Sequence, residues 1–116
     1  MNSAEIIRNF KNDITGLLGC EFKQSISRQV FELTGPVNCL LYVKTRKHKK
    51  TNWGITARVI ERLKSQGKPW LVVLLSSNQN NGYLLNENDI NNYISKLWDL
   101  KKDGDYKTST TLNKEK

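Results

Sequence analysis

Hydrophobic residues recur along this chain with two different spacings, and the spacings predict helices and strands in alternation. In residues 4–18 the apolar positions recur three or four apart, as on one face of a helix, and they are Ile6, Ile7, Phe10, Ile14, Leu17 and Leu18. Residues 55–66 have the same spacing and predict a second helix. Asn86 or Asn88 can cap a third helix. Its apolar face would consist of Ile90, Tyr93, Ile94, Leu97 and Trp98.

Shorter apolar runs between these segments predict strands. Residues 21–28 and 29–34 are typical of two successive antiparallel strands, and residues 38–45 of a third. The run 70–75 is continuously apolar, which is typical of a central strand that is covered on both faces. Because a helix joins it to the preceding strand, we expect the two strands to run parallel with a right-handed crossover.

The resulting order is α-β-β-β-α-β-(β)-α, with residues 83–85 as one further short strand. It predicts the α/β class, with a mixed central sheet flanked by helices. The length of 116 residues favours a single domain, which we place at residues 1–100. From residue 101 onward polar residues dominate, so residues 101–116 are expected to form a flexible C-terminal tail.

The charge balance points to a polyanionic partner. The formal net charge is +8 and the sequence pI is about 9.6, and neutralisation of phosphates dominates nucleic-acid affinity. A membrane surface or an acidic protein would also be attracted, and solubility alone is a further explanation.

Other features of the sequence limit the location and the kind of site. No apolar run approaches the ~20 residues that span a bilayer, and the N-terminus lacks the layout of a signal peptide. We therefore expect no membrane partner and a cytoplasmic location, either nucleoid-associated or elsewhere in the cell. Cys20 and Cys39 form no CxxC pair and are expected to be buried free thiols.

The stretch 38–56 carries the candidate chemistry. A buried strand ends at Lys44, and a strongly cationic segment follows it. Lys44 could act on a phosphate, or it could be a strand-end lysine that reaches solvent. The segment after it could contact phosphates while Trp53 stacks on a base. It could also be a solvated turn, with Trp53 folded onto the core. The residues predicted to bind nucleic acid are Arg46, Lys47, His48, Lys49, Lys50, Asn52 and Trp53.

Glu32 interrupts an otherwise apolar strand. A buried carboxylate is costly unless a cation or a metal ion pairs with it, so Glu32 is a candidate for a site. The alternative is an edge strand on which Glu32 faces water. On the next strand, Tyr42 and Lys44 share one face because side chains alternate.

This arrangement resembles the PD-(D/E)xK nuclease superfamily, in particular its small resolvase-like and YraN-like members. Over residues 4–75, Glu32 matches the first acid of the motif, and Lys44 in Leu41–Arg46 matches the lysine of the third strand. The resemblance implies a restriction-endonuclease-like αβββαβ core. It also implies Mg²⁺, or Mn²⁺, held by Glu32, by Glu5 of the first helix and by the carbonyl of Val43. Glu5 equally suits the helix dipole.

The sequence departs from the motif at one position. Tyr42 stands where the superfamily has Glu, and a neutral phenol is a poor ligand for magnesium. With Glu32, Lys44 and Tyr42 as catalytic residues, the resemblance implies a Mg²⁺-dependent DNA endonuclease. The alternative is a catalytically inactive DNA-binding or protein-interaction module of the same fold. A homodimer would suit cleavage of both strands, and the face of the last helix is either a dimer surface or core.

Overall fold

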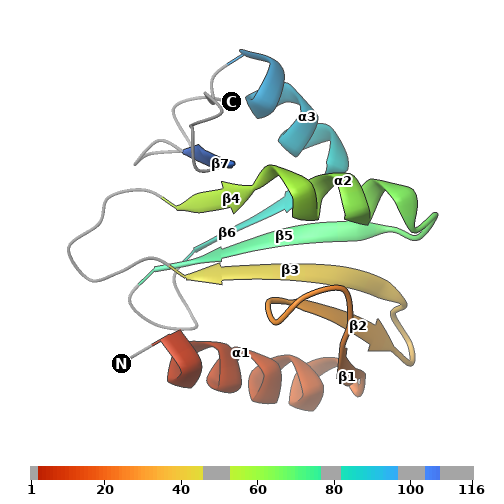
Figure 1. The fold of residues 1–116 in the computed structure, drawn as a ribbon. Helices are drawn as coiled ribbons and strands as arrows, with labels where there is room; N and C mark the ends of the chain where they lie inside the picture. Colours follow the sequence, from red (N-terminus) through yellow and green to blue (C-terminus); the bar gives the residue numbers. More distant parts are fainter. Residues whose placement is uncertain (1–2, 46–52, 77–81, 97–103, 108–116) are drawn as a thin grey trace.

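A mixed five-stranded sheet, in the order β1-β2-β3-β5-β6, forms the centre of the molecule (Figure 1). The structure is a computed structural model that describes residues 3–45, 53–76, 82–96 and 104–107. Its elements are α1 (Ser3–Leu18), β1 (Glu21–Gln24), β2 (Val30–Thr34), β3 (Cys39–Thr45), β4 (Gly54–Thr56), α2 (Ala57–Ser65), β5 (Trp70–Leu75), β6 (Gly82–Asn86), α3 (Glu87–Lys96) and β7 (Asp105–Lys107).

The directions of the strands follow from their connections. β1, β2 and β3 form an antiparallel meander, and β6 lies antiparallel to β5. β3 and β5 are joined through α2 and pair in parallel, from Leu40 opposite Trp70 to Thr45 opposite Leu75. The predicted α/β class with a mixed sheet and flanking helices is therefore confirmed, as is the parallel pair at its centre.

Helices cover both faces of the sheet, with α1 on one side and α2 and α3 on the other (Figure 1). Because side chains alternate along a strand, β3 contributes to both layers. Leu41 and Val43 pack on the α1 side together with Ile6. Leu40 and Tyr42 pack on the other side, in the larger cluster that includes residues of α2 and α3.

A second, two-stranded sheet lies beside the main one. β4 pairs antiparallel with β7, and the N–H of Ala57 donates to the carbonyl of Gly104 at 3.0 Å. From the sequence we expected residues 101–116 to form a tail and the second helix to begin at Ile55. Instead, residues 105–107 form a strand because Tyr106 packs against the core, and α2 begins only after β4.

The described helices contain no stretch that is both long and apolar enough to cross a lipid bilayer.

Candidate functional site

Two parallel strands end side by side at one edge of the sheet. β3 ends at Thr45 and β5 ends at Leu75, and these two residues are opposite each other. The N-terminal end of α1 lies on the same side of the molecule as these two strand ends (Figure 1). We call this the carboxyl edge. The cationic segment of the sequence follows Thr45 directly.

Lys44 is held at the carboxyl edge by the turn that precedes β2. Its Nζ donates to Oε1 of Gln29 at 3.3 Å, and the N–H of Val43 donates to the carbonyl of Gln29 at 2.8 Å. The side chain is half-buried, so its charge stays close to solvent. The predicted contacts Arg46, Lys47, His48, Lys49, Lys50 and Asn52 lie outside the residues that the structure describes.

Trp53 is part of the core and does not face a ligand. Its side chain is 1% exposed, and Nε1 donates to the carbonyl of Leu75 at 2.9 Å. Its ring meets that of Tyr83 edge-on, with the ring centroids 5.9 Å apart. Of the two interpretations of this residue, the one with Trp53 folded onto the core fits. The prediction that it stacks on a base does not, because a buried indole cannot reach a base.

Tyr42 is also a core residue, with a side chain that is 0% exposed. Its hydroxyl oxygen accepts a hydrogen bond from the N–H of Thr56 at 3.2 Å. Burial raises the pKa of the Tyr42 phenol, and the hydrogen bond from Thr56 partly offsets this shift. Tyr42 is therefore a neutral phenol at physiological pH, and its observed contacts are structural rather than catalytic.

Glu32 does not meet Lys44. Both lie on the α2 side of the sheet, but Glu32 is opposite Leu40, four residues from Lys44 along β3. At about 3.3 Å per residue the two positions are roughly 13 Å apart. The expected convergence is absent because the β2–β3 register places Val30 opposite Tyr42.

The partner of Glu32 is Lys68, which follows α2. The Glu32 Oε2 atom and the Lys68 Nζ atom are 2.5 Å apart in an ion pair on the surface. The hydrogen bond and the charge of Lys68 lower the pKa of Glu32, with a smaller contribution from the charge of Lys23. Glu32 is thus an ionised carboxylate with its own cation. This pairing accounts for an acid in an otherwise apolar strand.

The residues predicted to hold Mg²⁺ are not brought together. Glu5 belongs to α1, on one side of the sheet, whereas Glu32 points to the other side. Val43 packs its side chain on the α1 side, and its main chain pairs with the turn before β2. Within the described ranges no three His, Cys, Asp or Glu side chains are grouped so that they could hold a metal ion. These residues do not fit a magnesium site.

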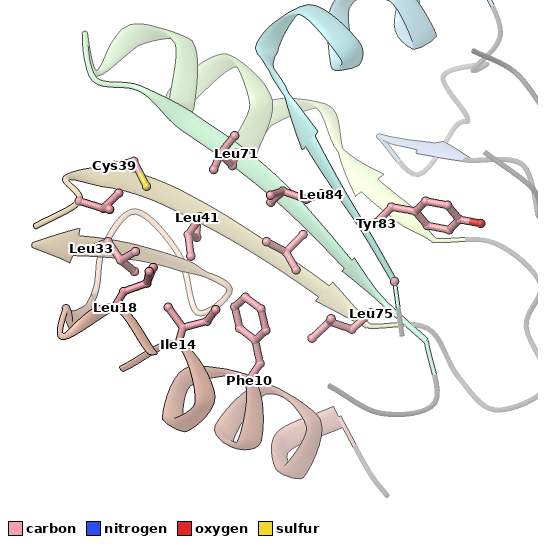
Figure 2. A pocket seen from close by; sticks show the side chains of 13 residues that line it. Phe10, Ile14, Leu18, Leu33, Cys39, Leu41, Leu71, Leu75, Tyr83 and Leu84 are labelled. Carbon is pink, nitrogen blue, oxygen red and sulfur yellow. The ribbon is translucent and has the colours of Figure 1, made fainter. Parts of the chain in front are cut away.

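An apolar hollow, which the sequence did not predict, lies on the α1 side of the sheet. Its volume is about 310 Å³. Figure 2 shows Phe10, Ile14 and Leu18 of α1 pointing toward sheet residues that include Leu41 and Leu84. The exposed large hydrophobic side chains of the described residues are Leu17, Leu18, Val37 and Leu84. Three of these four line the hollow.

The apolar hollow suits contact rather than chemistry. The one thiol in its lining belongs to Cys39, and burial raises the pKa of this thiol, with a smaller contribution from Cys20. A protonated thiol is a weak nucleophile. The sequence did assign Leu17 and Leu18 to the apolar face of the first helix. Local spacing could not show that Leu17 is left with 79% of its side chain exposed.

Comparisons of the chain with protein-family models, with curated proteins and with solved structures found no match.

Proposed function

We propose that this chain binds nucleic acid at the carboxyl edge of its sheet, with DNA as the first candidate. The observation that carries the proposal is the charge of one continuous stretch. Between Glu32 and Glu61 the sequence has no Asp or Glu but has six Lys and Arg residues. β3 delivers the first of these cations, Lys44, to the carboxyl edge.

The chemistry of phosphate binding fits this stretch. Each phosphate that a Lys or Arg neutralises releases counterions, and this release supplies most of the sequence-independent affinity for nucleic acid. Lys44 is preceded by buried strand residues that fix its main chain, and Gln29 positions its ammonium group. Five of the six cations lie at the end of β3 or within five residues of it, so they form a compact group in the sequence.

We infer binding without hydrolysis. Metal-dependent cleavage needs carboxylates that hold a cation next to the phosphate. Glu32 is roughly 13 Å along the sheet from Lys44, and Tyr42 is a buried phenol. The Mg²⁺-dependent endonuclease implied by the resemblance is therefore the second candidate. The first candidate is the catalytically inactive DNA-binding module that the same resemblance allows.

A salt titration with paired charge variants tests the proposal. Binding of labelled duplex DNA, single-stranded DNA and RNA is followed by fluorescence anisotropy at several salt concentrations. The variant Lys49→Gln/Lys50→Gln is compared with the control Lys23→Gln/Lys64→Gln, which removes the same charge from exposed positions on β1 and α2. We expect the first variant to reduce the slope of log K against log salt by about two, and the control to leave it unchanged.

Affinity that does not change with salt would contradict the proposal, as would equal effects of the two double variants. A parallel incubation of plasmid with Mg²⁺ or Mn²⁺ separates the two candidates. Metal-dependent nicking that is lost in both Lys44→Ala and Glu32→Ala would favour the endonuclease. The absence of nicking beside salt-dependent binding would favour the binding module.

A further inference from the structure

A second hollow, of about 350 Å³, lies between the N-terminal half of α1 and the segment that joins β1 to β2. We call it the basic hollow. Its polar lining consists of Arg8, Lys11, Asn12, Gln24 and Arg28. All of these side chains can donate hydrogen bonds, and three of them are cations. No carboxylate is among the residues that line it, so the hollow is a concave surface of positive charge.

The position of one cation is fixed by an aromatic ring. Lys11 Nζ lies 4.8 Å from the centroid of the Phe31 ring, a distance typical of a cation–π contact. Arg8 and Lys11 are three residues apart on α1 and therefore share one face of the helix. Phe31 belongs to β2 and lines the floor of the same hollow. The Phe31 ring thus positions the ammonium group of Lys11 in a hollow that Arg8 also lines.

The three cations have no acidic partners within the described part of the chain. The ion pair between Lys68 and Glu32 is on the other face of the sheet. Like charges that share a concave surface repel one another, and an anion between them would relieve this repulsion. Guanidinium groups present paired N–H donors that match two oxygens of a phosphate.

The basic hollow lies toward the carboxyl edge. β2 runs antiparallel to β3 and begins opposite Tyr42, so the turn before β2 is near the end of β3. Arg28 lines the hollow, and the next residue, Gln29, binds the ammonium group of Lys44. One short turn therefore connects the hollow on the α1 side of the sheet to Lys44 on the other side.

We propose that the basic hollow binds a backbone phosphate of nucleic acid and extends the interface from the end of β3 onto α1. This inference rests on the proposed function. The contact is independent of base sequence, because the lining offers cations and amides to the phosphate and its one aromatic ring, Phe31, is buried. The bound strand passes the carboxyl edge, with Lys44 on one side of the turn and Arg28 on the other.

Single charge variants of the full chain test this inference. Arg8→Gln and Arg28→Gln are compared with Lys64→Gln, an exposed lysine in the last turn of α2, and each variant lowers the net charge from +8 to +7. We expect each arginine variant to weaken binding of short duplex DNA roughly five-fold. Each should also reduce the salt slope by about one, and Lys64→Gln should leave both quantities near their wild-type values.

Conservative variants separate charge from geometry. Arg8→Lys and Arg28→Lys keep the charge, so we expect them to keep the salt slope and to lose only part of the affinity. All these side chains lie on the surface, and thermal melts should show that the variants fold as the wild type does.

The outcomes distinguish this inference from the proposed function. If Lys49→Gln/Lys50→Gln weakens binding while Arg8→Gln and Arg28→Gln match Lys64→Gln, the basic hollow is not used and only this inference is overturned. If the wild-type chain binds none of the nucleic acids, both are overturned.

Discussion

The hydroxyl oxygen of Tyr42 accepts a hydrogen bond from the main-chain N–H of Thr56, 3.2 Å away. Thr56 is the last residue of β4 and the N-cap of α2, so the bond joins the central strand to the start of a helix. The phenol is buried, and its removal would leave the N–H of Thr56 without this acceptor. We therefore expect Tyr42→Phe to lower the free energy of unfolding by about 1–2 kcal/mol, as measured by urea denaturation.

Tyr83→Phe is the matched control for this measurement. Within the described residues Tyr83 makes a ring contact with Trp53 and no hydrogen bond through its hydroxyl, which Figure 2 shows pointing away from the hollow. Removal of that hydroxyl should change the free energy of unfolding by less than about 0.5 kcal/mol. Equal losses in the two variants would show that the bond to Thr56 contributes nothing specific.

Restoring the acid of the PD-(D/E)xK motif at position 42 should not give the protein nuclease activity. Tyr42→Glu would place a carboxylate where the PD-(D/E)xK superfamily has one, but Val30 lies opposite that position and Glu32 lies opposite Leu40. Glu32 is already paired with Lys68, and the new carboxylate would be buried in an apolar cluster at a large cost in stability. We expect no plasmid nicking with Mg²⁺ or Mn²⁺, and a lower melting temperature.

Tyr42→Gln controls for the burial of a polar side chain at that position. Metal-dependent nicking by Tyr42→Glu, with none by Tyr42→Gln, would contradict this prediction. It would instead support the magnesium site implied by the resemblance.

The pairing of Glu32 with Lys68 should make a small part of the stability depend on pH. Lys68 lowers the pKa of Glu32 in the folded chain from its usual value of 4.5. A carboxyl whose folded pKa is lowered contributes stability above its unfolded pKa, and the contribution is lost as the pH falls through the folded pKa. We expect Glu32→Gln to melt slightly below the wild type at neutral pH.

The difference between the two melting temperatures should shrink toward zero as the pH falls below 4.5. The pair is exposed, so the effect is small, and a double-mutant cycle with Lys68→Gln isolates it. A difference that stays constant from neutral to acid pH would show that Glu32 acts through something other than its charge.

The sequence predicted those parts of the fold that depend on local patterns. The continuous apolar run 70–75 predicted a central strand, and the intervening helix predicted that it pairs in parallel with β3. Both follow from burial on two faces and from the connection between the strands. Residues 105–107, in contrast, were not predicted as a strand. Strand β7 depends on the packing of Tyr106 against a distant core, and a polar segment gives no local signal of that contact.

The candidate site could be predicted only in part, because its geometry depends on strand register. The alternation of side chains correctly placed Tyr42 and Lys44 on one face. The position of Glu32 relative to them depends on which residues of β2 and β3 are opposite each other. The sequence places Glu32 and Lys44 on adjacent strands. A shift of a few residues in the register of these strands decides whether the two side chains meet. The pairing with Lys68, 36 residues away in the chain, has no local signal either.

Two glycines should respond in opposite ways to the same substitution. Gly16 lies on the exposed side of α1, and a Cβ added there would meet no atom within 4 Å. Because alanine loses less conformational freedom than glycine when a helix forms, Gly16→Ala should raise the free energy of unfolding by about 0.5–1 kcal/mol. Gly82 begins β6 opposite Leu75, and a Cβ there would lie 1.9 Å from the carbonyl oxygen of Leu74.

The atom that Gly82 would meet belongs to the main chain of β5, so no side-chain rotation can relieve the contact. Gly82→Ala must move the start of β6 away from β5, at a cost of about 1–3 kcal/mol. Urea denaturation of both variants measures the expected rise in the free energy of unfolding for Gly16→Ala and the expected fall for Gly82→Ala. Hydrogen exchange at Tyr83 and Leu85 should show whether the loss in Gly82→Ala is local to the edge strand. A neutral Gly82→Ala would mean that β6 does not pair as closely with β5 as the register indicates.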